Sequence, residues 1–308
     1  MNSGHMALNK LKKNGQEHST AIKDIAISKT IQVIFIEDAV AFLKKVPDNS
    51  IQLLIIDPPY NLGLDYWDHF NNYLDWARQW LDELYRILAP TGNCVIFGGF
   101  QYQDLKKGDL LEILHYTRHQ TKLRFTNLII WYYKNGMSAH RYFANRHEEV
   151  VWLTKTKKYY FDLDAVRVPY SFEQKRSALR DKRLIPANVE KGKNPTNVWE
   201  IGRLNGNAKE RVGHPTQKPL ELIRRFVKSL SYEGSIVLDL FAGSGTTGCV
   251  CIEENRHCLM VDSDEKILEY FTKHLANQNP NSNYKPFEQY INKDIDQILK
   301  LIKDVSKN

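Results

Sequence analysis

Short apolar segments alternate with segments of helical spacing along most of this chain. A run such as Ile51–Ile56 is rich in β-branched residues and too short for a helix, so it predicts a buried strand. Because strands that alternate with helices build mostly parallel sheets covered on both faces, the chain predicts an α/β fold. The expected strands are residues 31–37, 51–56, 94–97, 126–133, 148–154, 235–239 and 257–261. The expected helices are residues 39–45, 71–88, 101–115, 219–231, 244–255, 264–275 and 288–305.

Composition limits the class of protein. Hydrophobic residues make up 42% and charged residues 26% of the 308 residues, which is ordinary for a globular protein. No apolar run approaches the ~20 residues of a membrane span. Residues 1–16 lack the apolar core of a signal peptide, so we expect a cytoplasmic protein. Residues 1–5 look like a cloning remnant and are left out of the fold prediction.

The four cysteines give no sign of a metal site. None forms a C-x-x-C pair, and none clusters with histidine at zinc-ligand spacing. We therefore expect buried, reduced thiols and no metal. The cysteines are Cys94, Cys249, Cys251 and Cys258.

Positive charge is concentrated in one irregular segment, residues 161–213. Eleven Lys and Arg against five Asp and Glu lie between Arg167 and Arg211, although the whole chain carries a net charge of +7. A basic segment of this kind suits nucleic acid, and the alternative is a solvated linker. The candidate DNA-binding residues are Arg176, Arg180, Lys182, Arg183, Lys191, Lys193 and Arg203.

The sequence Asp57-Pro58-Pro59-Tyr60 follows the predicted strand 51–56 directly. Two prolines prevent either a strand or a helix from continuing, so this segment predicts a rigid turn. The turn lies at the carboxyl end of a strand, which is the edge where open α/β sheets bind ligands. A carboxylate and free carbonyls can accept hydrogen bonds from an amino group, and a tyrosine ring can stack on a flat ring.

A glycine-rich turn follows the predicted strand 235–239. Gly243, Gly245 and Gly248 fit the G-x-G-x-x-G pattern, and Asp262 stands at the end of the next strand, where it suits ribose hydroxyls. Alone, this pattern fits a dinucleotide or a tight turn without a ligand. Asp239 would repel a pyrophosphate but suits the ammonium of a methionine moiety. The segment 214–219 adds Thr216 and Lys218, which suit a carboxylate, so S-adenosylmethionine is favoured.

Three motifs in this order resemble the beta group of bacterial N6-adenine and N4-cytosine DNA methyltransferases of restriction–modification systems. They are residues 57–60, residues 214–219 and the Asp-x-Phe-Ala-Gly-Ser-Gly of 239–245, and the similarity extends over about 31–276. The resemblance implies a Rossmann-like, seven-stranded sheet, circularly permuted so that the catalytic motif precedes the cofactor motif. It also implies an inserted target-recognition region, S-adenosylmethionine as cofactor, and base flipping followed by direct displacement on duplex DNA.

The same resemblance assigns roles to residues of the turns. Asp57 and the Pro58 carbonyl would accept the two amino hydrogens of the base, Pro59 would hold the turn, and Tyr60 would stack on the flipped ring. Because N4-cytosine members more often carry Ser in place of Asp57, adenine is favoured. Ring-carbon methylation of cytosine is disfavoured, since no proline precedes a cysteine. The implied cofactor-binding residues are Asp38, Thr216, Lys218, Asp239, Phe241, Gly243, Ser244, Gly245 and Asp262.

Five regions follow from these motifs. We expect an N-terminal extension, a catalytic half, a target-recognition region, a cofactor-binding half and a C-terminal extension, at residues 1–30, 31–160, 161–213, 214–276 and 277–308. Duplex DNA is the expected partner, with a cognate restriction endonuclease and a homodimer as further expectations from the resemblance. Open alternatives are an N4-cytosine methyltransferase, an NAD-dependent oxidoreductase, a catalytically silent DNA-binding module, or an RNA or protein substrate.

Overall fold

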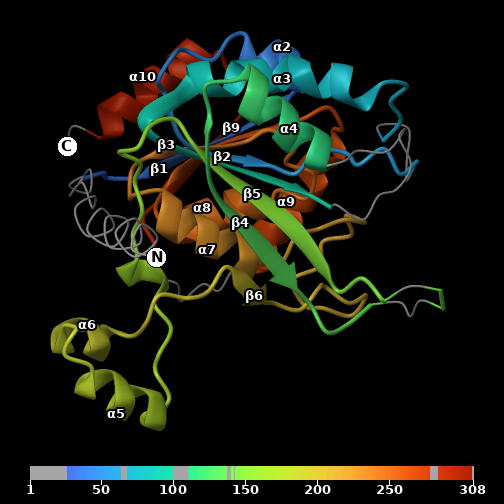
Figure 1. Cartoon of the computed structure of the whole chain (residues 1–308). Coiled ribbons are helices and arrows are strands. Elements are labelled where there is room, and N and C mark those ends of the chain that lie inside the picture. The colour runs from blue at the N-terminus through green and yellow to red at the C-terminus, as the bar shows by residue number, and fades with distance from the viewer. Residues whose placement is uncertain are drawn as a thin grey trace.

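A mixed sheet runs through the centre of the protein, with helices on both of its faces (Figure 1). The computed structural model describes residues 26–63, 68–99, 110–136, 140–141, 143–277 and 284–306. Residues 1–25 of the N-terminal extension, which include the proposed cloning remnant, and residues 101–109 of the predicted helix 101–115 lie outside these ranges. None of the helices described there is long and apolar enough to cross a membrane.

The sheet has nine strands in the order β6-β4-β5-β3-β2-β7-β8-β1-β9. Neighbouring strands are parallel except at β5, which runs antiparallel to both β3 and β4. The seven strands from β4 to β1 are the predicted ones, and β6 and β9 extend the sheet at its two edges. The strands are β1 (Thr30–Ile36), β2 (Ile51–Ile56), β3 (Leu88–Gly98), β4 (Arg124–Tyr132), β5 (His147–Thr154), β6 (Val198–Glu200), β7 (Ile236–Asp239), β8 (His257–Asp262) and β9 (Phe287–Ile291).

Two hydrophobic cores cover the two faces of this sheet. One face packs against α2 (Ala39–Leu43), α3 (Tyr73–Ile87), α4 (Leu110–Gln120) and α10 (Ile295–Val305). The other face packs against α7 (Leu220–Leu230), α8 (Thr246–Glu253) and α9 (Lys266–Asn277). Strands with buried side chains on both faces explain why apolar runs, rather than alternation, mark β2 and β7 in the sequence.

Three predicted elements differ from the structure, and one of them is α4, which ends at Gln120 rather than at residue 115. Residues 288–305 were expected to form one helix, but β9 occupies the first part and α10 begins at Ile295, where Asp294 caps it by accepting a hydrogen bond from the Gln297 amide. Pairing with β1 makes β9 a strand, and this non-local contact leaves no mark in local spacing. Likewise β3 begins at Leu88 rather than Cys94, because a register shift against β2 lets the strand pass through the predicted turn at Pro90.

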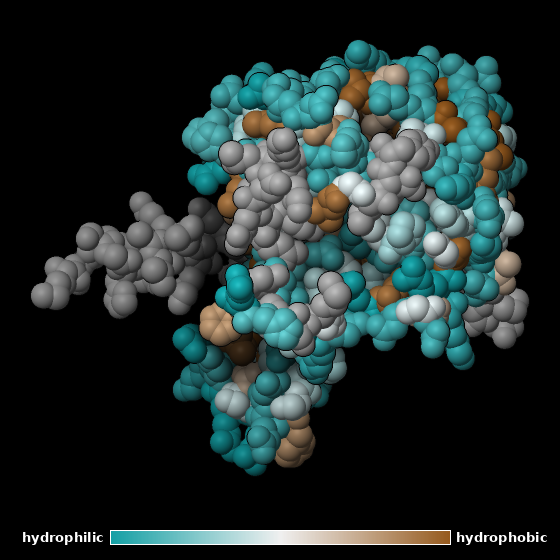
Figure 2. Space-filling model, turned by 90° about the vertical axis from the view of Figure 1, so that its right-hand side faces the viewer, coloured by the Kyte–Doolittle hydropathy of each residue, from teal (hydrophilic) through white to brown (hydrophobic). Residues whose placement is uncertain are grey.

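Residues 164–193 of the basic segment form a small lobe that projects from the sheet, while β6, later in the same segment, pairs with β4 (Figure 1). The lobe contains a short 3-10 turn η1 (Asp164–Val166) and the helices α5 (Phe172–Arg180) and α6 (Pro186–Lys191). A two-way backbone bridge between Val168 and Lys193 closes the base of the lobe. In Figure 2 the lobe lies below the main body, and hydrophilic side chains cover most of the face in view.

Candidate active site

The catalytic and glycine-rich turns lie side by side at the middle of the sheet. β2 pairs in parallel with β7, and Ile55 stands opposite Asp239 in this register. Both turns therefore leave the same edge, although they come from opposite halves of the chain. The chain after β2 turns to the α3 face, while the chain after β7 turns to the α8 face. This is a switch point of the sheet, where α/β folds bind ligands.

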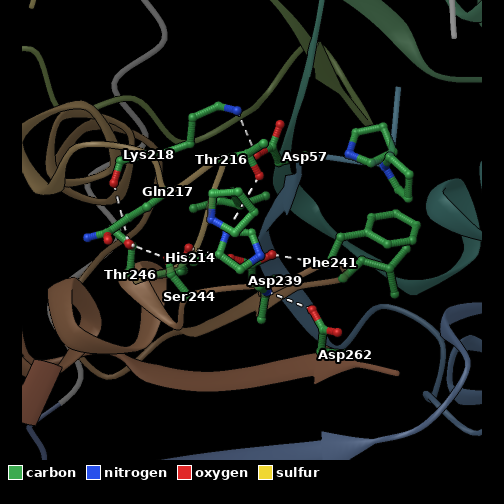
Figure 3. A pocket seen from close by; sticks show the side chains of 18 of the residues that line it. Asp57, His214, Thr216, Gln217, Lys218, Asp239, Phe241, Ser244, Thr246 and Asp262 are labelled. Carbon is green, nitrogen blue, oxygen red and sulfur yellow. Dashed lines mark hydrogen bonds and ion pairs between the residues drawn. The ribbon is translucent and has the colours of Figure 1, made fainter. Parts of the chain in front are cut away.

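One cavity of about 570 Å³ opens at this edge. Figure 3 shows side chains from both turns and from the segment before α7 converging on it. All four predicted catalytic residues line it, as do all the predicted cofactor residues except Gly245. The predicted residues that line it are Asp38, Asp57, Pro58, Pro59, Tyr60, Arg203, Thr216, Lys218, Asp239, Phe241, Gly243, Ser244 and Asp262.

The glycine turn needs glycine at two points for different reasons. Gly243 has a φ of +48°, and a Cβ atom there would lie 3.0 Å from the His214 ring. Gly245 has a φ of +76°, and its Cβ would lie 2.9 Å from the Phe271 ring, so this glycine serves the close packing of α8 on α9. The Gly243 amide donates to Asp262 Oδ2 at 2.7 Å, which joins the turn to the end of β8.

Asp239 is a nearly fully buried carboxylate at the start of this turn. It accepts hydrogen bonds from the Thr247 hydroxyl at 2.5 Å and from the Phe241 amide at 3.3 Å. Burial raises its pKa to about 7, and burial also raises the pKa of Asp262. Neither carboxylate forms an ion pair within the described part of the chain. Two desolvated acids beside a glycine turn therefore fit a ligand with an ammonium and with hydroxyl donors, as S-adenosylmethionine has.

A second set of charges surrounds the catalytic turn. Lys218 Nζ lies 2.8 Å from Asp57 Oδ2 and 3.6 Å from Glu148 Oε2, and Figure 3 shows the lysine reaching across to Asp57. The Tyr60 hydroxyl donates to Asp57 Oδ1 at 2.9 Å. The Lys218 ammonium thus lies at the catalytic carboxylate, while Thr216, two residues earlier, lies on the exposed rim of the cavity.

The loop after Tyr60 is anchored by a buried carboxylate that sequence reasoning did not single out. Asp68 accepts hydrogen bonds from the amides of Asn61 and Leu62, at 2.5 and 2.9 Å. The Asn61 side chain in turn exchanges two hydrogen bonds with the backbone of Phe70. This loop therefore has fixed ends, at residues 61–62 and 68–70, while its residues 64–67 lie outside the described ranges.

Sequence reasoning also missed four side chains on the far side of Asp57. The cavity wall there includes Trp131, Tyr133, Glu148 and Leu204. The first three lie near the adjoining ends of β4 and β5, which are paired strands. Glu148 is the second residue of β5, and no local pattern in the sequence links it to the catalytic turn.

The predicted DNA-binding residues divide between two places. Arg203 lines the cavity, and its guanidinium lies 5.1 Å from the centre of the Tyr133 ring. The other six lie on the projecting lobe, where Lys191 pairs with Asp164 and Arg183 with Asp181. Among the described residues, no group of three or more His, Cys, Asp or Glu is placed to hold a metal ion.

Comparison with known proteins identifies the family. Residues 51–273 match the N6/N4 methyltransferase family, described as DNA methylase. The chain is 36% identical over 253 residues to the type II methyltransferase M.HpaI of Haemophilus parainfluenzae, covering 80% of this chain and 75% of that protein. It is 30% identical to the DNA adenine methyltransferase YhdJ of Escherichia coli K12, over 75% of this chain and 78% of that one.

A solved structure shares the fold. The cytosine-N4-specific PvuII DNA methyltransferase aligns with a TM-score of 0.61 and 17% identity, over 93% of this chain and 95% of that chain. The nine-stranded sheet, the cavity at its switch point and the match over most of the chain agree with one another, and they exclude the dinucleotide oxidoreductase reading. The chain belongs to the N6/N4 family of DNA methylases and is a DNA methyltransferase that uses S-adenosylmethionine.

Proposed function

We propose that this enzyme methylates the exocyclic N6 of adenine in duplex DNA. The observation that carries the proposal is the Asp57 carboxylate, which lies with Tyr60 in the same cavity as the glycine turn. The name of the relative YhdJ supports adenine, while the N4-cytosine specificity of the structural neighbour keeps cytosine as the second candidate.

The catalytic turn would act on the amino group by orientation. The amino nitrogen of adenine is a poor nucleophile because its lone pair is delocalised into the ring. Asp57 and the Pro58 carbonyl would accept its two hydrogens and turn the lone pair toward the methyl group, while Tyr60 stacks on the extruded base. Pro59 keeps this turn rigid.

The cofactor supplies a methyl group on a positively charged sulfur. Asp239 would hold its ammonium and Asp262 its ribose hydroxyls, since both carboxyls are buried and face the cavity. Phe241, Gly243 and Ser244 would surround the rest of the methionine and ribose, with Asp38 beside the adenine ring and Thr216 near the carboxylate. Gly245 would contribute through the packing of the turn.

The projecting lobe would bind DNA. We propose that residues 161–213 are the target-recognition region, between a catalytic half at 31–160 and a cofactor half at 214–276, with extensions at 1–30 and 277–308. Exposed arginines and lysines on α5 and α6 suit phosphates and guanine edges. A cognate restriction endonuclease and a homodimer would be further partners. Four free buried thiols suit a reducing cytoplasm.

Sequencing of DNA from cells that express the protein tests this function, with a method that reads N6-methyladenine and N4-methylcytosine separately. We expect N6-methyladenine in one short sequence context with the wild type. Asp57→Ala should leave no modification, yet purified Asp57→Ala should still bind S-adenosylmethionine in titration calorimetry. Methylcytosine in place of methyladenine, or loss of cofactor binding together with activity, would contradict the proposal.

A further inference from the structure

The Lys218 ammonium occupies the hydrogen-bonding position that the proposed function gives to the target amine. Both oxygens of Asp57 are engaged, Oδ2 by Lys218 and Oδ1 by the Tyr60 hydroxyl. Lys218 also lies 5.6 Å from the centre of the Tyr60 ring, the ring proposed to stack on the base. An incoming amine that donates to Asp57 Oδ2 would compete there with Lys218, and a charged donor that loses its acceptor inside a cavity is costly.

Glu148 offers Lys218 a second acceptor a short distance away. Its Oε2 atom is buried, forms no hydrogen bond within the described ranges, and lies 3.6 Å from Lys218 Nζ. The side chains of Lys218 and Glu148 are only 10% and 16% exposed, so water screens their charges weakly. A small rotation of the lysine would bring the ammonium from Asp57 to Glu148.

The electrostatics around Glu148 favour this exchange. Burial raises the pKa of the Glu148 carboxyl, and Lys218 and Arg203 oppose that rise, while Asp57 adds to it. Tyr133, on the neighbouring strand, is the other titratable group that faces it. One lysine therefore lies within reach of two carboxylates, and the second can accept the ammonium when it leaves the first.

We propose that Glu148 is a positioning residue that receives the Lys218 ammonium when the amino group of the target base takes Asp57. The exchange makes and breaks only hydrogen bonds and ion-pair contacts, and the ammonium keeps its three protons throughout. Lys218 holds the Asp57 carboxylate in place in the absence of DNA, and Glu148 allows the lysine to leave. This inference rests on the proposed role of Asp57 toward the base.

Glu149 provides a matched control on the same strand. Successive residues of β5 face opposite sides of the sheet. Glu148 faces the cavity and α7, whereas Glu149 is a buried carboxylate that pairs with His147 at 2.9 Å and does not line the cavity. Changing Glu149 to Gln removes a neighbouring buried charge without touching Lys218.

The test measures the affinity of the protein for two DNA duplexes in the absence of cofactor, so that no methyl transfer takes place. The preference is the ratio of the two affinities. One duplex carries the sequence found by methylation sequencing, and the other has an abasic site in place of the target base. Only the first brings an amine to Asp57. For Glu148→Gln we expect the preference for the first duplex to fall by about tenfold, equivalent to ~1.4 kcal/mol, while S-adenosylmethionine affinity stays unchanged. Glu149→Gln should keep the wild-type preference, and Glu148→Asp should keep most of it.

The variant Lys218→Met shows whether Glu148 changes the duplex preference through Lys218. If Glu148 acts through Lys218, adding Glu148→Gln to Lys218→Met should change the preference no further. An unchanged preference in Glu148→Gln, or an equal loss with and without Lys218, would overturn the inference. The proposed function fails separately, if the wild type leaves no methyladenine in DNA.

Discussion

The Asp239 carboxyl shows how a cofactor site can cost stability before the cofactor binds. Its pKa is about 7 in the folded protein, mainly because of burial, against about 3.9 in an unfolded chain. Such a group contributes stability that is fully present below the unfolded pKa and is lost as the pH rises through the folded pKa. At pH 8 the cofactor-free protein therefore holds an unfavourable buried charge.

Asp239→Asn should stabilise the cofactor-free protein at pH 8 and weaken cofactor binding. We expect the free energy of unfolding to rise by ~1–2 kcal/mol, less than the pKa shift alone implies, because Asn keeps only part of the bonding to Thr247 and Phe241. Urea unfolding at pH 8 and at pH 5 checks this, since the gain should be smaller at pH 5, where the carboxyl is protonated in the folded protein and charged only in the unfolded chain. An equal change in unfolding free energy at both pH values would refute the explanation.

Individual site residues differ in how far the sequence predicts them. Asp57 directly follows β2, and Asp239 and Asp262 are the last residues of β7 and β8, so local sequence places all three at the ligand edge of the sheet. Lys218 was singled out as a cofactor-binding residue, and its contact with Asp57 depends on how the segment before α7 lies against the end of β2. The position of Glu148 in the cavity wall depends on the pairing of β5 with β4, a non-local contact that no local spacing encodes.

At the scale of elements, the lobe of α5 and α6 carries many basic side chains, and only some of them form ion pairs with a neighbouring acid. Arg176 and Arg180 lie exposed on α5 and form no ion pair with another described residue. Arg183 is also exposed, but its guanidinium lies 2.7 Å from the Asp181 carboxylate. An arginine held by a neighbouring acid releases fewer counterions from DNA, because part of its charge is already balanced.

Neutralising the free arginines should therefore weaken DNA binding more than neutralising the paired one. We expect Arg176→Gln and Arg180→Gln each to reduce the slope of log affinity against log salt by about 1, with S-adenosylmethionine affinity unchanged. Arg183→Gln, the matched control, should reduce it less. Fluorescence anisotropy over a series of salt concentrations gives the slopes, and equal slopes for all three variants and the wild type would show that α5 does not contact DNA.

The elements themselves were predicted best where their signal is local. The seven central strands and α3, α7, α8 and α9 follow from apolar runs and helical spacing, and their ends lie within a few residues of the prediction except at the start of β3. β9 was missed because its five half-exposed residues carry little apolar signal and become a strand only beside β1. The lobe was predicted as irregular, although the Ser171 and Gln174 capping box marks the start of α5.

At the scale of the molecule, the C-terminal segment completes the sheet and one of its cores. β9 covers the edge of β1, and α10 buries Ile295, Ile298 and Ile302 against the face that also holds α2 and α3. The segment predicted as an extension therefore shares the core with the catalytic half. Its packing should matter for the stability of the whole fold.

Ile298→Ala tests this contribution. Ile298 is fully buried, so its truncation should lower the free energy of unfolding by ~2–5 kcal/mol through lost burial and a cavity. Lys300→Ala, two residues along on the exposed side of the same helix, should change it by less than ~0.5 kcal/mol. Denaturant unfolding measures both, and similar small effects would mean that α10 is not part of the cooperative core.

The pairing of β2 with β7 also has a consequence for synthesis. The ribosome makes the catalytic turn early, and it makes β7, the strand that pairs with β2, only in the last third of the chain. During most of its synthesis the chain therefore contains Asp57 but lacks the glycine turn that completes the site. Contacts between distant parts of a chain form late and slowly. Cofactor binding and methyltransferase activity should thus appear together, in one late folding step. Incomplete chains should not methylate DNA.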